Sequence, residues 1–176
     1  NKDFTEYSLY YDGNQDESAI TYLALANRVI HQVDPEAITI AEDMSGMPGV
    51  ASPIEDGGMG FDYRMNMGTP DYWIKLLKEK RDEEWHVGDL FYELTNKREE
   101  EHTISYAESH DQALVGDKTI FFRLVDKAIY SSMGVFDKNV IIDRGMSLHK
   151  MIRLVTIGTA ADGYLNFMGN EWGHPE

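Results

Sequence analysis

Residues 37–42 decide the fold, and they read AITIAE. The first five are apolar or β-branched without a break, which favours a strand that is buried on both faces. Such strands are typical of parallel sheets, because helices cover both faces of those sheets. The segment therefore predicts an α/β fold, with the acidic Glu42 directly behind the strand.

A helix precedes this strand and a loop follows it. Apolar residues recur at helical spacing over residues 18–33, and Asp34-Pro35 ends the pattern. Behind Glu42, a long loop that contains glycine and proline runs from Asp43 to about Gly58. We expect residues 59–61 to form a second, very short strand.

The rest of the chain continues the alternation of helices and strands. Thr69-Pro70-Asp71 predicts a helix start, since it offers a capping hydroxyl, a proline for the first turn and an acid near the positive end of the helix dipole. Further helices are expected over 88–94, 118–133 and 143–157, and further strands over 103–107 and 164–168. Parallel strands need such helical crossovers. The pattern fits both a doubly wound sheet and part of a (β/α)8 barrel.

The charge of the chain argues against two classes of partner. Its 176 residues contain 16 Lys and Arg and 31 Asp and Glu, for a net charge of −15. Nucleic acids and anionic membrane surfaces both bind to clustered positive charge. We therefore expect neither of them as a partner, and no apolar run approaches the roughly 20 residues that a membrane-spanning helix needs.

The chain contains no cysteine, although 42% of its residues are hydrophobic. Disulfides, thiolate catalysis and cysteine-ligated zinc are therefore excluded. The hydrophobic content is sufficient for a packed core. This composition fits a reducing compartment, and we expect a cytoplasmic location.

Acidic residues follow the expected strands. They are Glu42, Asp62, Glu108, Asp111 and Glu171. The carboxyl ends of parallel strands converge on one cleft, so these carboxylates are expected to gather there. Carboxylate pairs perform acid, base or nucleophilic chemistry, for example in glycoside cleavage. Neighbouring rings that could bind sugars are Tyr63, Tyr106, His110, Trp172 and His174.

Each of these residues also has a simpler interpretation. A single acid after a strand is more often a helix cap or a loop residue than a catalyst. A metal site formed by His110, Asp111, Glu171 and His174 is conceivable, but no known ligand spacing is present, so we expect no metal and no cofactor. We interpret His31, His86 and His149 as ordinary surface or core-edge residues, and Glu99-Glu100-Glu101 as a solvated charge run.

Several longer motifs resemble the 1,4-α-glucan (glycogen) branching enzymes of the α-amylase superfamily. The motifs are AEDMSGMP at 41–48, GFDYR at 60–64, YAESHDQ at 106–112, VGDK at 115–118, DRG at 143–145, LHKMIR at 148–153, YLNFMGNE at 164–171 and GHPE at 173–176. They extend over essentially the whole chain. Such motifs are far longer than a chance pattern.

The resemblance implies a (β/α)8 catalytic barrel. Residues 1–176 would form its C-terminal half, strands 5 to 8 with the intervening helices, as one partial domain without a second domain. It implies that Glu42 is the general acid/base, that Asp111 stabilises the transition state and that His110 binds a sugar hydroxyl. We also expect Asp62, Gln112 and Glu171 to bind substrate.

The resemblance further implies a reaction. The family cleaves α-1,4-glucan chains such as glycogen and amylose and transfers them to a 6-hydroxyl, which forms α-1,6 branches in glycogen biosynthesis by a retaining double displacement. Its nucleophilic aspartate ends strand 4, which corresponds to a position ahead of residue 1. We therefore expect a segment of a longer protein that is inactive alone and self-associates through the open edges of strands 5 and 8.

Two alternatives remain open from the sequence. An amylase-like hydrolase would use the same carboxylates with water as the acceptor. A non-catalytic fragment that binds glucan would use the acids and aromatic rings only for sugar contacts.

Overall fold

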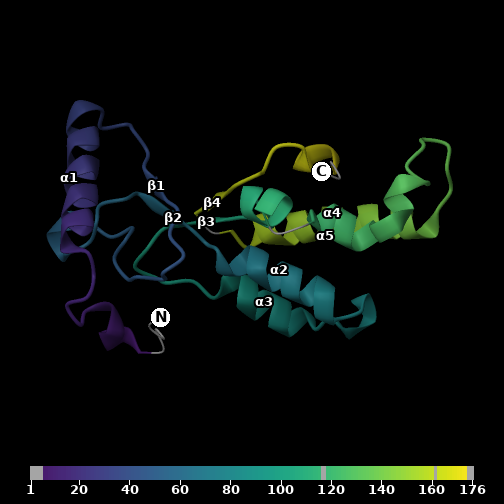
Figure 1. The fold of residues 1–176 in the computed structure, drawn as a ribbon, viewed down its shortest axis with the longest axis horizontal. Coiled ribbons are helices and arrows are strands. Elements are labelled where there is room, and N and C mark those ends of the chain that lie inside the picture. The colour runs from purple at the N-terminus through teal and green to yellow at the C-terminus, as the bar shows by residue number, and fades with distance from the viewer. Residues whose placement is uncertain (1–5, 116–117, 161, 174–176) are drawn as a thin grey trace. The chain divides into compact units, whose positions relative to one another are not determined.

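The computed structural model describes residues 6–115, 118–160 and 162–173, and Figure 1 shows its helices and strands. The chain divides into two compact units. Unit 1 comprises Asn1–Met65 and Arg98–Thr103, and unit 2 comprises Asn66–Lys97 and Ile104–Glu176. Over the described ranges, no helix combines the length and the apolar character needed to cross a membrane.

The first described elements of unit 1 are a short 3-10 helix, η1 (Tyr7–Tyr10), and the long helix α1 (Glu17–Val33). The carboxylate of Asp16 accepts a hydrogen bond from the Ala19 N–H and so caps α1. The predicted helix over 18–33 is thus confirmed. Residues on one face of α1 pack against a small core of Ala41, Val50 and Met59.

The strands of unit 1 are β1 (Ile40–Ala41) and β2 (Tyr63–Met65), which are parallel with Ile40 opposite Tyr63. β1 is shorter than the predicted strand over 37–41. The predicted strand over 59–61 is wrong, because the Met59 N–H bonds to the Gly49 carbonyl and Gly60 has a φ of 75°. This segment turns back onto its own loop, which also contains the 3-10 helix η2 (Ile54–Asp56).

Unit 2 contains most of the helices. They are α2 (Gly68–Glu79), η3 (Asp82–Glu84), α3 (Val87–Thr95), α4 (Ile120–Val125), η5 (Asp126–Tyr130), α5 (Val140–Gly158) and η6 (Asn170–Trp172). The prediction over 88–94 is confirmed by α3. The predicted helix over 118–133 is instead divided into α4 and η5, because Asp126 has a φ of 45° that an α-helix cannot accommodate.

Two helix starts also differ from expectation. The residue that precedes α2 is Met67, and the Thr69 hydroxyl is buried in the first turn without capping it. α5 starts at Val140, three residues before the predicted position, because the Asn139 side chain accepts a hydrogen bond from the Ile141 N–H at 2.9 Å.

Unit 2 contains β4 (Gly163–Tyr164) and, from Ile104 onward, β3 (Thr103–Ser105), which are parallel with Ile104 opposite Gly163. The predicted strand over 164–168 is mostly wrong. The Leu165 N–H still donates to the Ser105 carbonyl at 2.9 Å, and regular pairing then ends. A single turn of π-helix over Asp111–Val115, labelled η4, follows β3.

The core of unit 2 lies between its helices. Trp73 of α2 is fully buried, and its indole N–H donates to the Thr156 hydroxyl of α5 at 2.9 Å. Ile120 and Phe121 of α4 belong to the same core as Ile152 of α5. Each unit thus combines helices with a pair of parallel strands, which confirms the predicted α/β class.

Candidate active site

Glu42 directly follows β1, and its side chain is exposed. In the register of unit 1, Ala41 lies opposite Arg64 of β2. The carboxylate of Glu42 therefore leaves the backbone at the carboxyl end of the β1–β2 pair. Functional side chains of parallel α/β proteins are found at this end of a strand.

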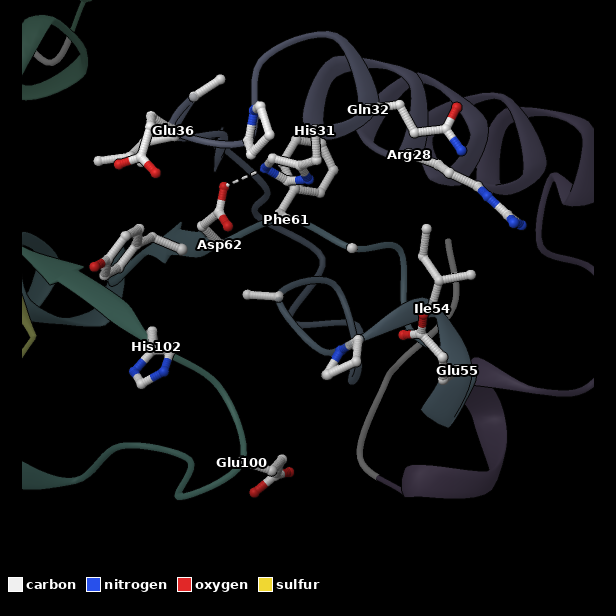
Figure 2. A pocket seen from close by; sticks show the side chains of 17 residues that line it. Arg28, His31, Gln32, Glu36, Ile54, Glu55, Phe61, Asp62, Glu100 and His102 are labelled. Carbon is white, nitrogen blue, oxygen red and sulfur yellow. Dashed lines mark hydrogen bonds and ion pairs between the residues drawn. The ribbon is translucent and has the colours of Figure 1, made fainter.

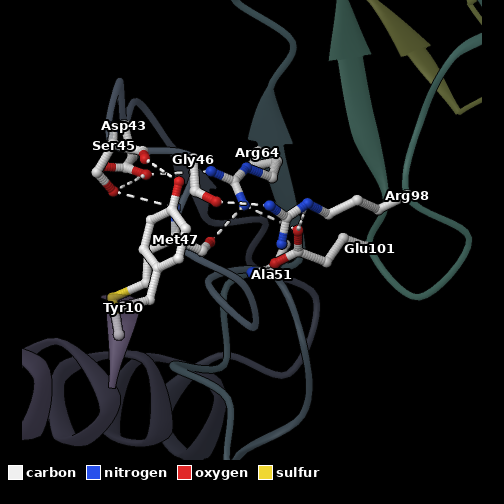
Figure 3. A network of polar contacts seen from close by, with 9 residues as sticks. All are labelled: Tyr10, Asp43, Ser45, Gly46, Met47, Ala51, Arg64, Arg98 and Glu101. Atoms are coloured by element: carbon white, nitrogen blue, oxygen red, sulfur yellow. Dashed lines mark hydrogen bonds and ion pairs between the residues drawn. The ribbon is translucent and has the colours of Figure 1, made fainter. Parts of the chain in front are cut away.

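A buried ion pair of unit 1 binds Asp43, the residue that follows Glu42 in the sequence (Figure 3). Arg64 donates through Nη1 to Glu101 Oε2 at 2.8 Å and through Nη2 to Asp43 Oδ2 at 3.0 Å. Arg64 is 7% exposed and Glu101 is 3% exposed. The predicted solvation of Glu101 is therefore wrong, because this carboxylate neutralises a buried arginine.

The loop behind Glu42 is attached to the same pair. Arg64 Nη1 also donates to the Met47 carbonyl at 2.7 Å, and Glu101 Oε1 accepts from the Ala51 N–H at 3.1 Å. Arg98 Nη2 donates to the Gly46 carbonyl at 2.6 Å. The segment from Asp43 to Ala51 is thus held at several points by residues of β2 and of the 98–101 segment.

Asp62 lies at the other end of the strand pair. It precedes β2, and its Oδ2 atom accepts from the Thr39 N–H at 2.7 Å, from the Thr39 hydroxyl at 3.0 Å and from His31 at 3.0 Å. Burial raises the pKa of Asp62, but the bonds from Thr39 and His31 outweigh this effect and lower it overall. The expectation that Asp62 follows a strand is wrong, since β2 starts only after it.

Asp62 and His31 line a pocket of unit 1 with a volume of about 920 Å³ (Figure 2). The walls of this pocket are formed by residues of α1, of the segments 35–38, 51–55 and 60–63, and by Glu100 and His102. Glu42 is not part of this lining. His31 is therefore not an ordinary surface residue, and no spacing in the sequence signals its pairing with Asp62, 31 positions away.

In unit 2, His110 and Asp111 follow β3 and a buried segment, Tyr106–Ser109. His110 Nε2 lies 3.3 Å from Asp111 Oδ1, and the two side chains are 50% and 36% exposed. Asp111 begins the single π-helical turn. Such turns occur often at functional sites. This arrangement presents an imidazole and a carboxylate side by side to solvent.

Glu108, the other acid behind β3, has a structural role. It is 1% exposed, and its two oxygens accept from the Ile120 N–H at 2.7 Å and from Arg153 Nη2 at 3.1 Å. Burial raises the pKa of Glu108, against the opposing effect of the Ile120 N–H and two arginines. Glu108 therefore ties the segment before Asp111 to α4 and α5.

Arg153 also binds a buried histidine. His149 is 5% exposed, and its Nε2 accepts from Arg153 Nε at 3.2 Å. Burial, together with the charge of Arg153, lowers the pKa of His149 to about 4. The Nη1 atom of Arg153 reaches the Tyr164 hydroxyl and Asn166 Oδ1, both at 3.3 Å.

The remaining predicted residues lie in unit 2. Gln112 is 7% exposed, and its Oε1 accepts from the Ser109 N–H at 2.8 Å and from the Ser109 hydroxyl at 3.0 Å. Glu171 and Trp172 are exposed in η6. His174 lies outside the described residues. The accessible candidates in the described part of this unit are therefore His110, Asp111, Glu171 and Trp172.

Comparison with known proteins reveals similarity over almost the whole chain. The chain is 56% identical over 171 residues to the 1,4-alpha-glucan-branching enzyme of Rhizophagus irregularis, an alignment that covers 97% of this chain and 25% of that protein. It is 56% identical over 172 residues to the enzyme of the same name from Felis catus, with the same coverage of both chains. No protein-family model matches the chain.

A plant relative is equally similar. The 1,4-alpha-glucan-branching enzyme 2-2, chloroplastic/amyloplastic, of Arabidopsis thaliana is 58% identical over 171 residues, which are 97% of this chain and 21% of that protein. The chain thus spans about a quarter of the length of the curated relatives it matches. Since the name of the plant relative includes a chloroplastic location, the expected cytoplasmic location stays a prediction.

Proposed function

The chain belongs to the family of the 1,4-alpha-glucan-branching enzymes, and from this premise we propose that residues 1–176 supply the C-terminal half of a (β/α)8 catalytic barrel. Both units would be parts of one barrel domain, with β1 to β4 as its strands 5 to 8. Two features support this proposal: parallel strand pairs alternate with helices, and acids follow β1 and β3.

The proposed reaction transfers α-1,4-glucan chains to the 6-hydroxyl of an acceptor glucan, such as glycogen. Glu42 protonates the glycosidic oxygen that leaves while a carboxylate nucleophile bonds to the anomeric carbon. Glu42 then takes the proton of the acceptor 6-hydroxyl, whose oxygen displaces the nucleophile and forms the α-1,6 bond. Asp111 stabilises the positive charge that develops on the sugar ring.

The remaining roles concern substrate binding. His110, beside Asp111, would bind a sugar hydroxyl, and Glu171 is exposed and able to do the same. Gln112 would act mainly through its bonds to Ser109, which shape the segment that carries His110. Asp62 lies at the opposite end of the β1–β2 pair from Glu42, so we leave it out of this site.

One observation carries the proposal: more than half of the residues are identical to those of branching enzymes over 97% of the chain. The resemblance assigns the nucleophile to a position ahead of residue 1. We therefore propose that residues 1–176 alone do not complete the reaction, whereas a longer protein that contains them does.

The first test incubates residues 1–176 with amylose and follows the anomeric protons of α-1,6 linkages by NMR. We expect no new signal from this chain and a clear signal from the longer protein. Glu42→Gln in the longer protein should reduce branching by a factor of about 10² to 10⁴ or more. A signal from residues 1–176 that Glu42→Gln abolishes would contradict the assigned roles.

The same experiment separates the alternatives. Reducing sugar released by the longer protein without new α-1,6 linkages would indicate a hydrolase. Saturable binding of glycogen without turnover by either protein would indicate a glucan-binding role.

We also propose that residues 1–176 self-associate in isolation. Ile38 and Ile40, in and next to β1, are 67% and 49% exposed, and an apolar strand edge of this kind is a template for pairing. A monomeric mass by light scattering at micromolar concentration would contradict this proposal.

A further inference from the structure

We propose that Arg64 and Glu101 are positioning residues that fix the loop behind Glu42 and thereby favour transfer to a sugar hydroxyl over hydrolysis. The inference rests on the proposed function, because it concerns the fate of the same glycosyl intermediate. Its structural part, the fixation of the loop, is measurable without any activity.

Arg64 and Glu101 together hold the loop in place, and we call this pair the clamp (Figure 3). The guanidinium of Arg64 bonds simultaneously to the Asp43 carboxylate, the Met47 carbonyl and the Glu101 carboxylate, at 3.0, 2.7 and 2.8 Å. These partners lie 21, 17 and 37 residues away in the sequence. The side chain of Arg64 in β2 thus connects two points of the loop, Asp43 and Met47, to Glu101 in the 98–101 segment.

Glu101 completes the clamp from the other side. Its side chain is fully buried, and its two oxygens bind Arg64 Nη1 and the Ala51 N–H, while Arg98 Nε lies 3.8 Å from Oε2. A buried carboxylate is costly unless it is paired and fully hydrogen-bonded. Because Glu101 meets this requirement only when the loop is in place, the pair favours one arrangement of the loop.

Glu42 is held between two fixed neighbours as a result. Ala41 belongs to β1, and Asp43 binds Arg64 while it also accepts from the Ser45 N–H and hydroxyl. The backbone on both sides of Glu42 is therefore fixed by contacts within unit 1. A general acid/base needs such a fixed position, since small displacements reduce its efficiency strongly.

The identity of the acceptor depends on the same loop. In transfer, the oxygen of the 6-hydroxyl bonds to the anomeric carbon, the bond to the nucleophile breaks, and Glu42 takes the hydroxyl proton. In hydrolysis, a water oxygen forms that bond and Glu42 takes a proton from water. The two reactions differ only in what occupies the space beside Glu42, so a loop that keeps water out favours transfer.

The first experiment measures amide hydrogen exchange in residues 1–176. Arg64→Lys keeps the positive charge but loses the fork that binds three partners at once. We expect amides of the 44–52 segment to exchange at least about tenfold faster, and those of α1 to keep their rates. Arg28→Lys changes an exposed arginine of α1 in the same way and serves as the matched control.

The second experiment uses the longer protein with branching activity and measures the ratio of reducing ends to new α-1,6 linkages. Arg64→Lys and Glu101→Gln should raise this ratio at least about tenfold, whereas Arg28→Lys should leave it unchanged. A purely structural role would lower both products equally and leave the ratio constant. Arg98→Lys loses one contact to the loop and should give a smaller change in the same direction.

The outcomes are distinguishable. Unchanged exchange in Arg64→Lys would overturn the clamp itself. Faster exchange with an unchanged product ratio would overturn the effect on acceptor choice, while the proposed function would stand. A longer protein that forms no α-1,6 linkage even in its unaltered form would instead overturn the proposed function. If Arg64→Lys does not fold, Arg98→Lys provides the same two measurements.

Discussion

Unit 1 and unit 2 each contain a buried glutamate that an arginine neutralises, and each of these ion pairs contacts the segment that carries a candidate residue. In unit 1, Arg64 pairs with Glu101 and reaches Asp43, the neighbour of Glu42. In unit 2, Arg153 pairs with Glu108, three positions before Asp111. Both units therefore use a buried ion pair to fix the backbone at a candidate catalytic residue.

The two pairs differ in what else they bind. Arg64 binds only oxygens in the described part of the chain, including a backbone carbonyl of the loop that it fixes. Arg153 also binds the neutral His149, and Glu108 caps the first turn of α4. The pair of unit 1 thus holds a loop. The pair of unit 2 connects α4 to α5, and its arginine also contacts His149, which titrates in acid.

Removal of either arginine should have the largest effect on stability. Arg153→Met removes the arginine that forms an ion pair with the buried Glu108 and should reduce the free energy of unfolding by about 3–5 kcal/mol. Denaturant unfolding followed by tryptophan fluorescence measures this change in unit 2, because all three tryptophans, Trp73, Trp85 and Trp172, lie there.

Arg64→Met is the counterpart of this change in unit 1. It should reduce the free energy of unfolding by a similar amount. Because unit 1 contains no tryptophan, this loss should be measured as faster hydrogen exchange of the amides of unit 1. A large change in tryptophan fluorescence at the same denaturant concentration would show that the units unfold together, and would weaken the comparison.

Acid should affect unit 2 through His149. Burial holds the pKa of His149 near 4 in the folded chain, below its ordinary value of 6.5. The unfolded chain therefore binds more protons between these values, so stability is highest above pH 6.5 and falls by up to about 3 kcal/mol as the pH decreases to 4.

The raised pKa of Glu108 acts in the opposite direction, since its protonated form is favoured in the fold and its contribution grows as the pH falls. The pH dependence of the unfolding midpoint should decrease in His149→Gln. An unchanged dependence in that variant would assign the acid sensitivity to other groups.

The hydrogen bond between Trp73 and Thr156 allows a smaller test of the helical core. Thr156→Val keeps the shape of the side chain but leaves the buried indole N–H of Trp73 without its acceptor. We expect the free energy of unfolding of unit 2 to fall by about 1–3 kcal/mol, measured as a lower denaturant midpoint. Thr95→Val, which removes a hydroxyl from the exposed end of α3, is the control and should have a minor effect.

The cap of α1 should give the smallest effect. Asp16→Ala removes the acceptor for the Ala19 N–H and should cost about 1 kcal/mol, measured as faster exchange of the first amides of α1. Asp16→Asn keeps an acceptor oxygen and should recover most of the loss. Equal effects of both substitutions would mean that charge, and not the hydrogen bond, stabilises this helix start.

Sequence patterns predicted helices well where the apolar spacing and the end signals lie within the same short segment. The helices α1 and α3 were predicted almost to their ends, because apolar spacing and end signals lie within each segment. The predictions over 59–61 and 164–168 failed for a reason that is not local. Whether the strand covers residues 59–61 or begins at Tyr63 depends on where the neighbouring strand offers its hydrogen bonds.

The acidic residues also fall into two groups, those whose positions the sequence predicted and those whose roles depend on distant partners. The sequence by itself determined the family, the α/β class and the positions of Glu42 and Asp111 behind strands, since these follow from contiguous residues. Only the tertiary structure decided that Glu101 and Glu108 are buried anchors and that Asp62 lies at the opposite end of its strand. Their partners Arg64, Arg153 and His31 lie 31 to 45 residues away, and the folded chain alone brings each acid to its partner.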